Sequence, residues 1–376
     1  MSAPPRLLMS PPHMSGREQE FVADAFASNW IAPVGPYVTQ FEERLSALCG
    51  GAHVAALSSG TAALHLALRL SEIGRGDEVW CSTMTFIGGV APILYENGAP
   101  VFLDVEEDTM LIDLDLLEDR LVAAERAGAV PKVVLTTDLY GLVPDVDRIL
   151  ALKERFGFVW ISDAAESVGS YRDGRHAGVG ADFAILSFNG NKIITTSGGG
   201  ALLGPDPCAI ERARFLATQA REPAPHYEHV TIGYNYRLSN ICAAIGVGQL
   251  EVLSERVSAR RRIHDQYRRL LSGIAGVSFS PEPAGVTANR WLTTICIDPD
   301  VTGFTPDRAR LAFDAAGIES RPVWKPMHRQ PVFADARHVG GAAADRAFAR
   351  GLCLPSGSAM SDPDVERVAS VLLELA

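Results

Sequence analysis

The chain has 376 residues, 47% of them hydrophobic, and a formal net charge of −11. Its length suits two domains of about 150 residues each, and the acidic balance without a long basic block argues against nucleic acid or an acidic membrane surface as a partner. No apolar run approaches membrane-spanning length, and the proline-rich start "MSAPPRLLMSPPHM" is not typical of a signal peptide.

The first half of the chain alternates short apolar runs with helical patterns. Strands are predicted over 53–59, 77–82, 100–105, 132–138, 158–164 and 183–188, and helices over 61–73, 113–128 and 145–157. The strands are apolar on both faces, as expected when helices cover both sides of a mostly parallel sheet. We therefore expect an α/β fold.

The pattern changes after residue 240. Residues 241–274 are predicted to form one long helix, which begins apolar and ends basic. The remainder, with a strand-like run at 289–298 and helices at 307–317 and 362–376, indicates a smaller α+β domain. We place the boundary near Gln249, giving a large domain 1–248 and a small C-terminal domain 249–376.

The segment "LSSGTAALHLAL" (57–68) reads as a strand, a turn of small residues and a helix. Gly60 and Thr61 would present free backbone N–H groups at a helix N-terminus, which is a site for phosphate. The alternative is an ordinary helix cap by serine or threonine.

The segment "WISDAAESVGS" (160–170) places Asp163 at the end of a predicted strand. Carboxylates at the C-terminal ends of strands in open α/β sheets lie where ligands bind, and an ionised aspartate there can pair with a protonated pyridine nitrogen. The alternative is that Asp163 caps the next helix, with Glu166 as its capping-box partner or as a second polar contact to a ligand.

The segment "SFNGNKIITTSGGG" (187–200) isolates Lys192 among small residues, between the apolar runs 182–189 and 200–204. A lysine in such a turn is usually solvated. On a tight connection between two core strands, however, burial disfavours the charged amine, and a neutral amine can attack a carbonyl to form a Schiff base.

The six cysteines are scattered without a Cys-x-x-Cys pair, so we expect neither a zinc site nor a disulfide framework. Reduced thiols are typical of a cytoplasmic protein. The spacing of His226 and His229 permits two metal ligands, but no third is evident, and we expect no metal.

A phosphate-binding turn, an aspartate at a strand end and an isolated lysine, in this order, are what pyridoxal 5′-phosphate (PLP) requires. The order resembles a PLP-dependent enzyme of fold type I, with an aspartate aminotransferase-like large domain and a small C-terminal domain. More closely, the chain resembles the DegT/DnrJ/EryC1/StrS family of nucleotide-sugar aminotransferases over nearly its whole length. The resemblance is carried by "SNWIAPVGPYVTQFEE", "SSGTAALHLAL", "SDAAESVGS", "SFNGNKIITTSGGGAL", "GYNYRLSNICAAIGVGQLE" and "RPVWKPMHRQPVF".

The resemblance implies a role for each residue that matches the family pattern. Lys192 resembles the Schiff-base lysine and Asp163 the partner of the ring nitrogen. The other expected cofactor contacts are Gly60, Thr61 and Ser187 at the phosphate, Phe86 on one face of the ring, Glu166 near the ring hydroxyl, and Asn235 reaching the phosphate of the neighbouring subunit. For Phe86 the alternative is a core phenylalanine.

Two further segments resemble the family's substrate loops. They contain Asn29, Trp30, Ile31 and Ala32 in the first, and Trp324, Lys325 and His328 in the second. For His328 a hydrogen-bonded structural histidine is an equal alternative. The chain departs from the family where many members have glycine and glutamate after the lysine, because Ser197 stands there without an acid.

The resemblance also implies an activity and an assembly. We expect amino transfer from L-glutamate to the C4 ketone of a nucleotide-linked 4-keto-6-deoxy sugar, because "SNWIAP", "NGNKIITTSGGG" and "HYEH" resemble members that aminate a UDP-linked N-acetylglucosamine derivative in bacillosamine synthesis. The alternatives are a GDP-linked keto-sugar leading to perosamine, or a non-catalytic nucleotide-sugar-binding protein of the same fold. A homodimer with shared active sites is expected.

Overall fold

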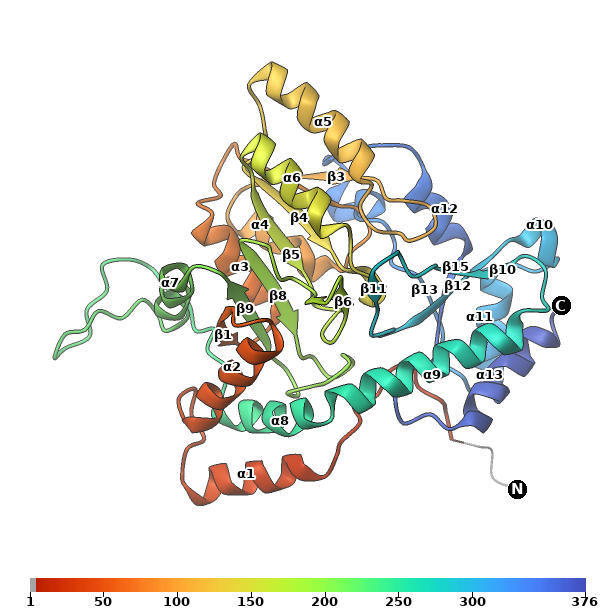
Figure 1. Ribbon diagram of the computed structural model, residues 1–376, viewed down its shortest axis with the longest axis horizontal. Coiled ribbons are helices and arrows are strands. Elements are labelled where there is room, and N and C mark those ends of the chain that lie inside the picture. Colours follow the sequence, from red (N-terminus) through yellow and green to blue (C-terminus); the bar gives the residue numbers. More distant parts are fainter. Residues whose placement is uncertain (1–4) are drawn as a thin grey trace.

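The computed structural model describes residues 5–376 and is built around an eight-stranded sheet (Figure 1). The strand order is β1-β9-β8-β5-β4-β2-β3-β14, and β9 runs antiparallel to neighbours that otherwise point the same way. The bounds are β1 His53–Leu57, β2 Glu78–Ser82, β3 Ala99–Leu103, β4 Val133–Thr137, β5 Val159–Asp163, β8 Phe183–Ser187, β9 Gly200–Gly204 and β14 Arg337–Val339. The predicted mostly parallel sheet is confirmed, and each predicted strand lies within two residues of the observed one.

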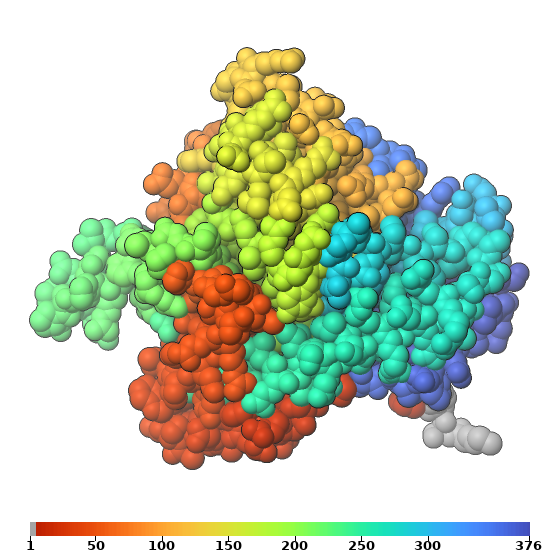
Figure 2. Space-filling model, in the orientation of Figure 1, coloured from red at the N-terminus to blue at the C-terminus, as the bar shows by residue number. Residues whose placement is uncertain are grey.

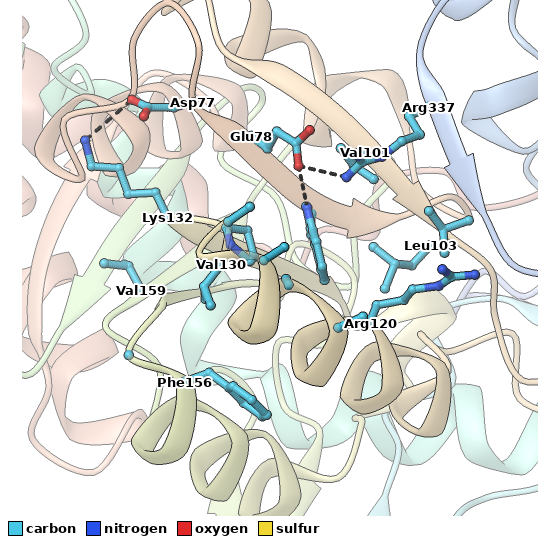
Figure 3. Close-up of a pocket in the computed structure, with 18 of the residues that line it drawn as sticks. Asp77, Glu78, Val101, Leu103, Arg120, Val130, Lys132, Phe156, Val159 and Arg337 are labelled. Carbon is cyan, nitrogen blue, oxygen red and sulfur yellow. Dashed lines mark hydrogen bonds and ion pairs between the residues drawn. The ribbon is translucent and has the colours of Figure 1, made fainter.

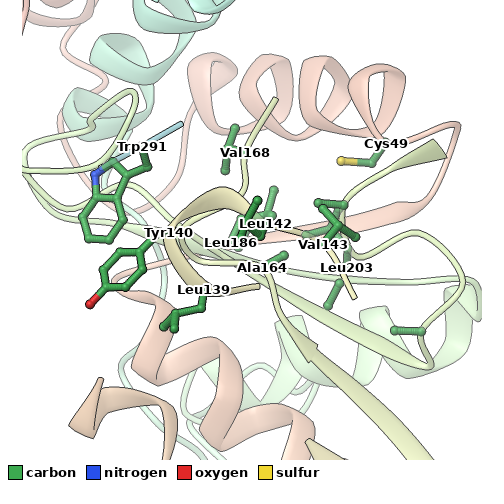
Figure 4. Packing of buried hydrophobic residues seen from close by; sticks show 14 of the residues in the cluster. Cys49, Leu139, Tyr140, Leu142, Val143, Ala164, Val168, Leu186, Leu203 and Trp291 are labelled. Atoms are coloured by element: carbon green, nitrogen blue, oxygen red, sulfur yellow. The ribbon is translucent and has the colours of Figure 1, made fainter. Parts of the chain in front are cut away.

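Helices cover both faces of this sheet because alternate strand residues are buried on opposite sides. Ala55 and Leu57 pack into one apolar cluster with α3, α4 and α7, whereas Val54 and Ala56 pack into another with α2, α5, α6 and α8. Part of the second cluster is shown in Figure 4. The bounds are α2 Pro36–Leu48, α3 Gly60–Leu70, α4 Ala91–Tyr95, α5 Leu114–Ala127, α6 Val146–Phe156, α7 Pro207–Ala217 and α8 Asn240–Glu251, and α1 Arg17–Ala27 packs outside α8.

The long helix predicted over 241–274 is wrong in one respect, because two helices stand there. They are α8 and α9 Leu253–Leu271. Between them Val252 leaves the helical region, with φ −113° and ψ 10°, and its N–H donates to the carbonyl of Gln249 at 3.2 Å. This three-residue spacing tightens the last turn of α8 and ends it.

The C-terminal part has its own four-stranded sheet in the order β10-β12-β15-β13 and its own apolar cluster with α9, α11 and α13. However, β14 pairs with β3 of the large sheet. The division at Gln249 therefore stays a prediction. The remaining bounds are α10 Pro299–Thr302, α11 Pro306–Ala315, α12 Ala343–Arg350, α13 Asp362–Leu373, β6 Tyr171–Arg172, β7 Arg175–His176, β10 Val277–Phe279, β11 Val286–Thr287, β12 Thr293–Ile297, β13 Arg321–Pro322 and β15 Gly351–Leu354.

An irregular arm spanning 221–232 extends from the body after α7 (Figures 1 and 2). Its apolar side chains Tyr227, Val230 and Ile232 are 79–80% exposed. Among residues 5–376, no helix combines the length and apolar character needed to cross a membrane.

Candidate active site

A cavity of about 330 Å³ opens at the carboxyl ends of the central strands. Ligands of open α/β sheets bind at this edge. The cavity brings together eight of the residues singled out in the sequence, from segments up to 264 positions apart. They are Gly60, Thr61, Phe86, Asp163, Glu166, Ser187, Lys192 and Trp324.

A larger cavity of about 860 Å³ lies between the sheet and helices α5 and α6 (Figure 3). It lies at the opposite edge, because Glu78 and Val159 begin their strands and Lys132 precedes β4. The Glu78 carboxylate accepts hydrogen bonds from Trp80 at 3.0 Å and from Arg337 at 2.8 Å. Since none of the eight predicted residues lines it, we assign the chemistry to the smaller cavity.

The N-terminus of α3 forms one end of the smaller cavity. Ser59 caps the helix by accepting a hydrogen bond from the N–H of Ala62 at 3.0 Å. The N–H groups of Gly60 and Thr61 lie in the first turn of α3 and have no intrahelical acceptor. A Cβ at Gly200 would lie 2.3 Å from the nitrogen of Gly60, so β9 can pack against this terminus only without a side chain there. The predicted cap is present, and it leaves free the N–H groups that the predicted anion site requires.

Asp163 ends β5 and is 8% exposed. The alternative that it caps a helix is wrong, because turns rather than a helix follow it through Ser170. Its Oδ1 accepts a hydrogen bond from the N–H of Ala165 at 3.2 Å. Burial raises the pKa of the Asp163 carboxyl above its usual range, although the charge of Lys192 and the Ala165 N–H oppose the increase.

Lys192 lies inside the cavity with its side chain 13% exposed, so the solvated alternative is wrong. Its Nζ lies 3.8 Å from Oε1 of Glu166 and 4.3 Å from the ring centroid of Trp291. The Trp291 indole N–H donates to the carbonyl of Asn191 at 2.7 Å. This hydrogen bond holds the ring against the lysine loop, the connection between β8 and β9 that carries Lys192. A carboxylate and an aromatic face both stabilise a cationic amine, and together they fix where it points.

Glu166 is 5% exposed and is not a capping-box partner. Its Oε2 accepts from the N–H of Tyr140 at 2.8 Å, and its Oε1 from the indole N–H of Trp324 at 3.3 Å. Burial raises the pKa of Glu166, while the charge of Lys192 lowers it in part. The carboxyl therefore joins three segments of the site.

Aromatic rings, those of Phe86 and Trp324 among them, form another part of the cavity wall. Phe86 is 53% exposed, so the alternative of a core phenylalanine is wrong, and its ring centroid lies 5.4 Å from that of Trp324. Trp324 stacks on Tyr140, with centroids 6.3 Å apart, and its backbone N–H donates to the Tyr140 hydroxyl at 2.8 Å. These rings give the cavity an apolar side suited to a flat ligand.

The other predicted site residues lie outside this cavity. Asn235 is exposed, and its Oδ1 accepts from the side chain of Gln219 at 3.1 Å. Asn29, Trp30, Ile31 and Ala32 form an exposed loop. Asn240 at the start of α8 holds that loop, donating to the carbonyls of Trp30 at 2.7 Å and Ala32 at 2.9 Å.

Lys325 and His328 follow Trp324 but do not line the cavity. His328 Nδ1 lies 2.7 Å from Oγ1 of Thr83, and its ring stacks on His338 with centroids 3.8 Å apart. This geometry agrees with the structural alternative for His328. A substrate role for the two residues stays a prediction.

Several residues that line the cavity were not predicted from the sequence, among them Thr85, Gly88, Gly89, Asn189, Asn191 and Trp291. Trp291 is the most informative, because it comes from the C-terminal part and contacts Lys192 from 99 positions away. No local pattern predicts that contact.

Comparison with known proteins also indicates an aminotransferase. Residues 12–373 match the model of the DegT/DnrJ/EryC1/StrS aminotransferase family. The chain is 50% identical over 374 residues to EpsN of Bacillus subtilis (strain 168), named as a pyridoxal phosphate-dependent aminotransferase, and the match covers 98% of this chain and 96% of EpsN. It is 34% identical over 374 residues to GDP-perosamine synthase of Caulobacter vibrioides, with 99% of each covered. The crystal structure of the aminotransferase TlmJ from Streptoalloteichus hindustanus matches with a TM-score of 0.90 at 30% identity, over 98% of both chains.

The chain therefore belongs to the DegT/DnrJ/EryC1/StrS aminotransferase family. It is an aminotransferase that depends on PLP, and the predicted family, fold, cofactor and reaction class are confirmed.

The residues of the cavity fit PLP. Asp163 is a buried carboxyl with one N–H donor, so a protonated ring nitrogen would supply the positive charge that it lacks. The α3 N-terminus suits the phosphate, and the aromatic wall suits a planar ring. Each chemical part of the cofactor thus has a matching feature in one cavity.

The space beside Asp163 depends on Gly89. A Cβ there would lie 2.7 Å from both Oδ2 of Asp163 and Oγ1 of Thr85. We expect Gly89→Ala to displace the carboxyl and weaken PLP binding by about 1–3 kcal/mol, the usual effect of overpacking. Spectroscopic titration of the cofactor-free protein with PLP measures this. The matched control is Gly190→Ala in the lysine loop, where the nearest atom would be 3.9 Å away. Equal affinities for the two variants would contradict the prediction.

Proposed function

We propose that the protein transfers the amino group of L-glutamate to the C4 ketone of a nucleotide-linked 4-keto-6-deoxy sugar, most specifically UDP-2-acetamido-2,6-dideoxy-hexos-4-ulose. The observation that carries this proposal is the convergence of Lys192, Asp163 and the N-terminus of α3 in one cavity of a family aminotransferase. The relative named GDP-perosamine synthase supports a nucleotide-linked sugar as the substrate class.

PLP, when bound, acts as an electron sink that stabilises a carbanion next to the transferred nitrogen. Asp163 would keep the ring nitrogen protonated, and the N–H groups of Gly60 and Thr61 with the hydroxyl of Ser187 would hold the phosphate. Phe86 would contact the ring. These residues keep the cofactor in place while the substrates exchange.

Lys192 is the group that moves protons. Its amine takes a proton from the carbon that bears the donor's amino group and later returns one to C4 of the sugar, so L-glutamate leaves as 2-oxoglutarate and the ketone becomes an amine. Glu166, 3.8 Å from Nζ, and the face of Trp291 hold the amine in reach of the cavity.

The substrate sugar has one close alternative, a GDP-linked 4-keto-6-deoxymannose, which the similarity to GDP-perosamine synthase supports. A non-catalytic nucleotide-sugar-binding protein is the second alternative, and the buried Lys192 and Asp163 argue against it.

An assay with L-glutamate and a panel of UDP-, GDP- and dTDP-linked 4-keto-sugars tests the substrate. We expect the highest kcat/KM with the UDP-linked N-acetyl sugar. A higher value with a GDP-linked sugar would overturn the UDP assignment and leave the reaction class in place, whereas no turnover with any of them would overturn the sugar-aminotransferase proposal.

We further propose a two-fold homodimer with shared active sites. Asn235 is exposed on its own subunit and lies outside that subunit's cavity, so it is free to serve the neighbour's phosphate. The arm 221–232 just before it exposes Tyr227, Val230 and Ile232, and exposed apolar side chains of this size favour a protein partner. We expect an obligate interface of order 2,000 Å² or more in total. A cytoplasmic location is proposed from the cysteines alone, all six of which are free.

Subunit exchange tests the shared site. Lys192→Ala subunits keep a good Asn235, whereas Asn235→Asp subunits keep the lysine but place a negative charge beside the partner's phosphate. Each homodimer should be poorly active, and mixed dimers should partly recover, because one of their two sites is intact. Demonstrated heterodimers without recovery would show that Asn235 acts within its own chain.

A further inference from the structure

A third carboxyl lies directly behind the wall of the active-site cavity. Asp138 follows β4 and is 1% exposed. Its backbone N–H donates to the carbonyl of Asp163 at 3.0 Å, so the two residues are neighbours on adjacent strands. The mechanism above gives this side chain no role, although a buried acid beside a reactive carboxylate affects its charge.

The hydrogen bonds around Asp138 suit a neutral acid better than a carboxylate. Among the described residues its Oδ1 has no hydrogen-bond partner, and its Oδ2 lies 2.7 Å from Oγ of Ser167. That hydroxyl is also 3.2 Å from the carbonyl oxygen of Ala164. With a proton on Oδ2, Asp138 donates to Ser167 and Ser167 donates onward to Ala164, so both hydroxyls have an acceptor.

If Asp138 were ionised, the hydrogen-bonding needs of its carboxyl would be less well satisfied in the same geometry. Ser167 would then be the donor to Oδ2, and Oδ1 would be a buried charged oxygen without a hydrogen-bond partner, although the nearby Ser162 hydroxyl also favours the charged form. Burying a carbonyl oxygen without a hydrogen bond costs less free energy than burying a charged oxygen without one. The unpartnered atom thus points to a protonated side chain.

The surrounding charges also favour the protonated form of Asp138. Burial raises the pKa of Asp138 to about 8, the charges of Asp163 and Glu166 add to the increase, and the hydroxyls of Ser167 and Ser162 oppose it. Lys192 is a cation close to the other two carboxyls, and its charge lowers the pKa of Asp163 and of Glu166. A cofactor with one protonated ring nitrogen balances Asp163 and leaves Asp138 without a counter-charge.

We propose that Asp138 is a positioning residue that stays protonated at neutral pH and releases its proton to solvent at alkaline pH, so that the negative charge beside the cofactor's ring nitrogen is set by pH. While Asp138 is neutral, Asp163 is the charged partner of the ring. Once it ionises, a second negative charge makes the ring nitrogen hold its proton more tightly. The effect on the cofactor rests on the proposed role of Asp163, but the protonation of Asp138 does not.

Infrared spectroscopy of the cofactor-free protein tests the protonation alone. The wild type should show the carbonyl stretch of a buried protonated carboxyl that disappears as the pH rises through about 8, and Asp138→Asn should lack that band. Asp119→Asn, at an exposed aspartate of α5, is the matched control and should keep it. An unchanged band in Asp138→Asn would overturn the proposal, whatever the activity of the enzyme.

A second variant keeps the test independent of how Asp138→Asn folds. Ser167→Ala removes the donor to the ionised carboxyl, so the band should persist to higher pH than in the wild type. A shift to lower pH would contradict the assigned hydrogen bonds.

The absorbance of bound PLP then tests the coupling. Its pH titration in the wild type should extend to higher pH than in Asp138→Asn, where no second charge can form. Identical titrations combined with a lost infrared band would show that Asp138 is protonated but not coupled to the cofactor. That result would overturn the positioning role.

Discussion

Replacing Lys192 with alanine should lower turnover by roughly 10⁴-fold or more, the upper range for the loss of a positioned proton-transfer group. The variant loses the amine that moves protons at the reacting carbons. It should still bind pyridoxamine phosphate, because Gly60, Thr61, Ser187 and Asp163 remain in the cavity. Single-turnover kinetics and a binding titration measure the two effects separately.

The control is Lys132→Ala, which removes an exposed lysine at the other edge of the sheet. Its activity should remain close to that of the wild type. Residual amino transfer above about a hundredth of the wild-type rate in Lys192→Ala would show that another base does the work, since a positioned base contributes at least about 10²-fold.

Asp163→Asn should have the second-largest effect. The amide keeps the shape of the carboxylate but not the charge that holds the ring nitrogen protonated, so we expect a loss of turnover of about 10²–10³-fold, the range for removing one preorganised electrostatic contact. PLP affinity should also fall, by about 1.5–3 kcal/mol for the charge-assisted hydrogen bond. Steady-state kinetics with saturating PLP separates the two losses.

The stability of the cofactor-free protein provides the control for Asp163→Asn. Burial raises the folded-state pKa of Asp163 above the ordinary value of 3.8, so its contribution to stability is complete below that value and is lost as the pH rises through the raised pKa. The asparagine variant should therefore gain stability relative to wild type as the pH increases from about 4 to neutrality. A variant that is instead progressively less stable would indicate that the loss of activity comes from unfolding.

The sequence predicted the central sheet well because its signals are local. Apolar runs of strand length between helical patterns locate β1 to β5, β8 and β9 within two residues, since burial on both faces requires apolar side chains at every position. The three motif residues Gly60, Asp163 and Lys192 meet in the structure because each follows or ends a strand at the same edge.

Contacts between distant segments could not be predicted in this way. The Trp291 ring beneath Lys192, the Glu166 contact to Trp324 and the pairing of β14 with β3 depend on how the C-terminal part packs on the large sheet. The motif "RPVWKPMH" placed three residues in one substrate loop, yet Trp324 lines the cavity whereas Lys325 and His328 do not.

The departure at Ser197 has a local consequence in the backbone. This residue has φ 72°, in the left-handed region that favours glycine, and its N–H donates to Oγ1 of Thr195 at 2.9 Å. The strain that serine carries here is offset in part by that hydrogen bond. The sequence alone shows the exception but not the backbone angle that this residue adopts.

Transfer of the nitrogen itself tests the central claim most directly. The purified holoenzyme is incubated with [¹⁵N]-L-glutamate and the UDP-linked 4-keto sugar, and the sugar product is examined by NMR. The account predicts ¹⁵N bonded to C4 of the sugar and an equal amount of 2-oxoglutarate. Consumption of the sugar without ¹⁵N at C4, or no reaction of glutamate with an enzyme shown to contain PLP, would contradict it.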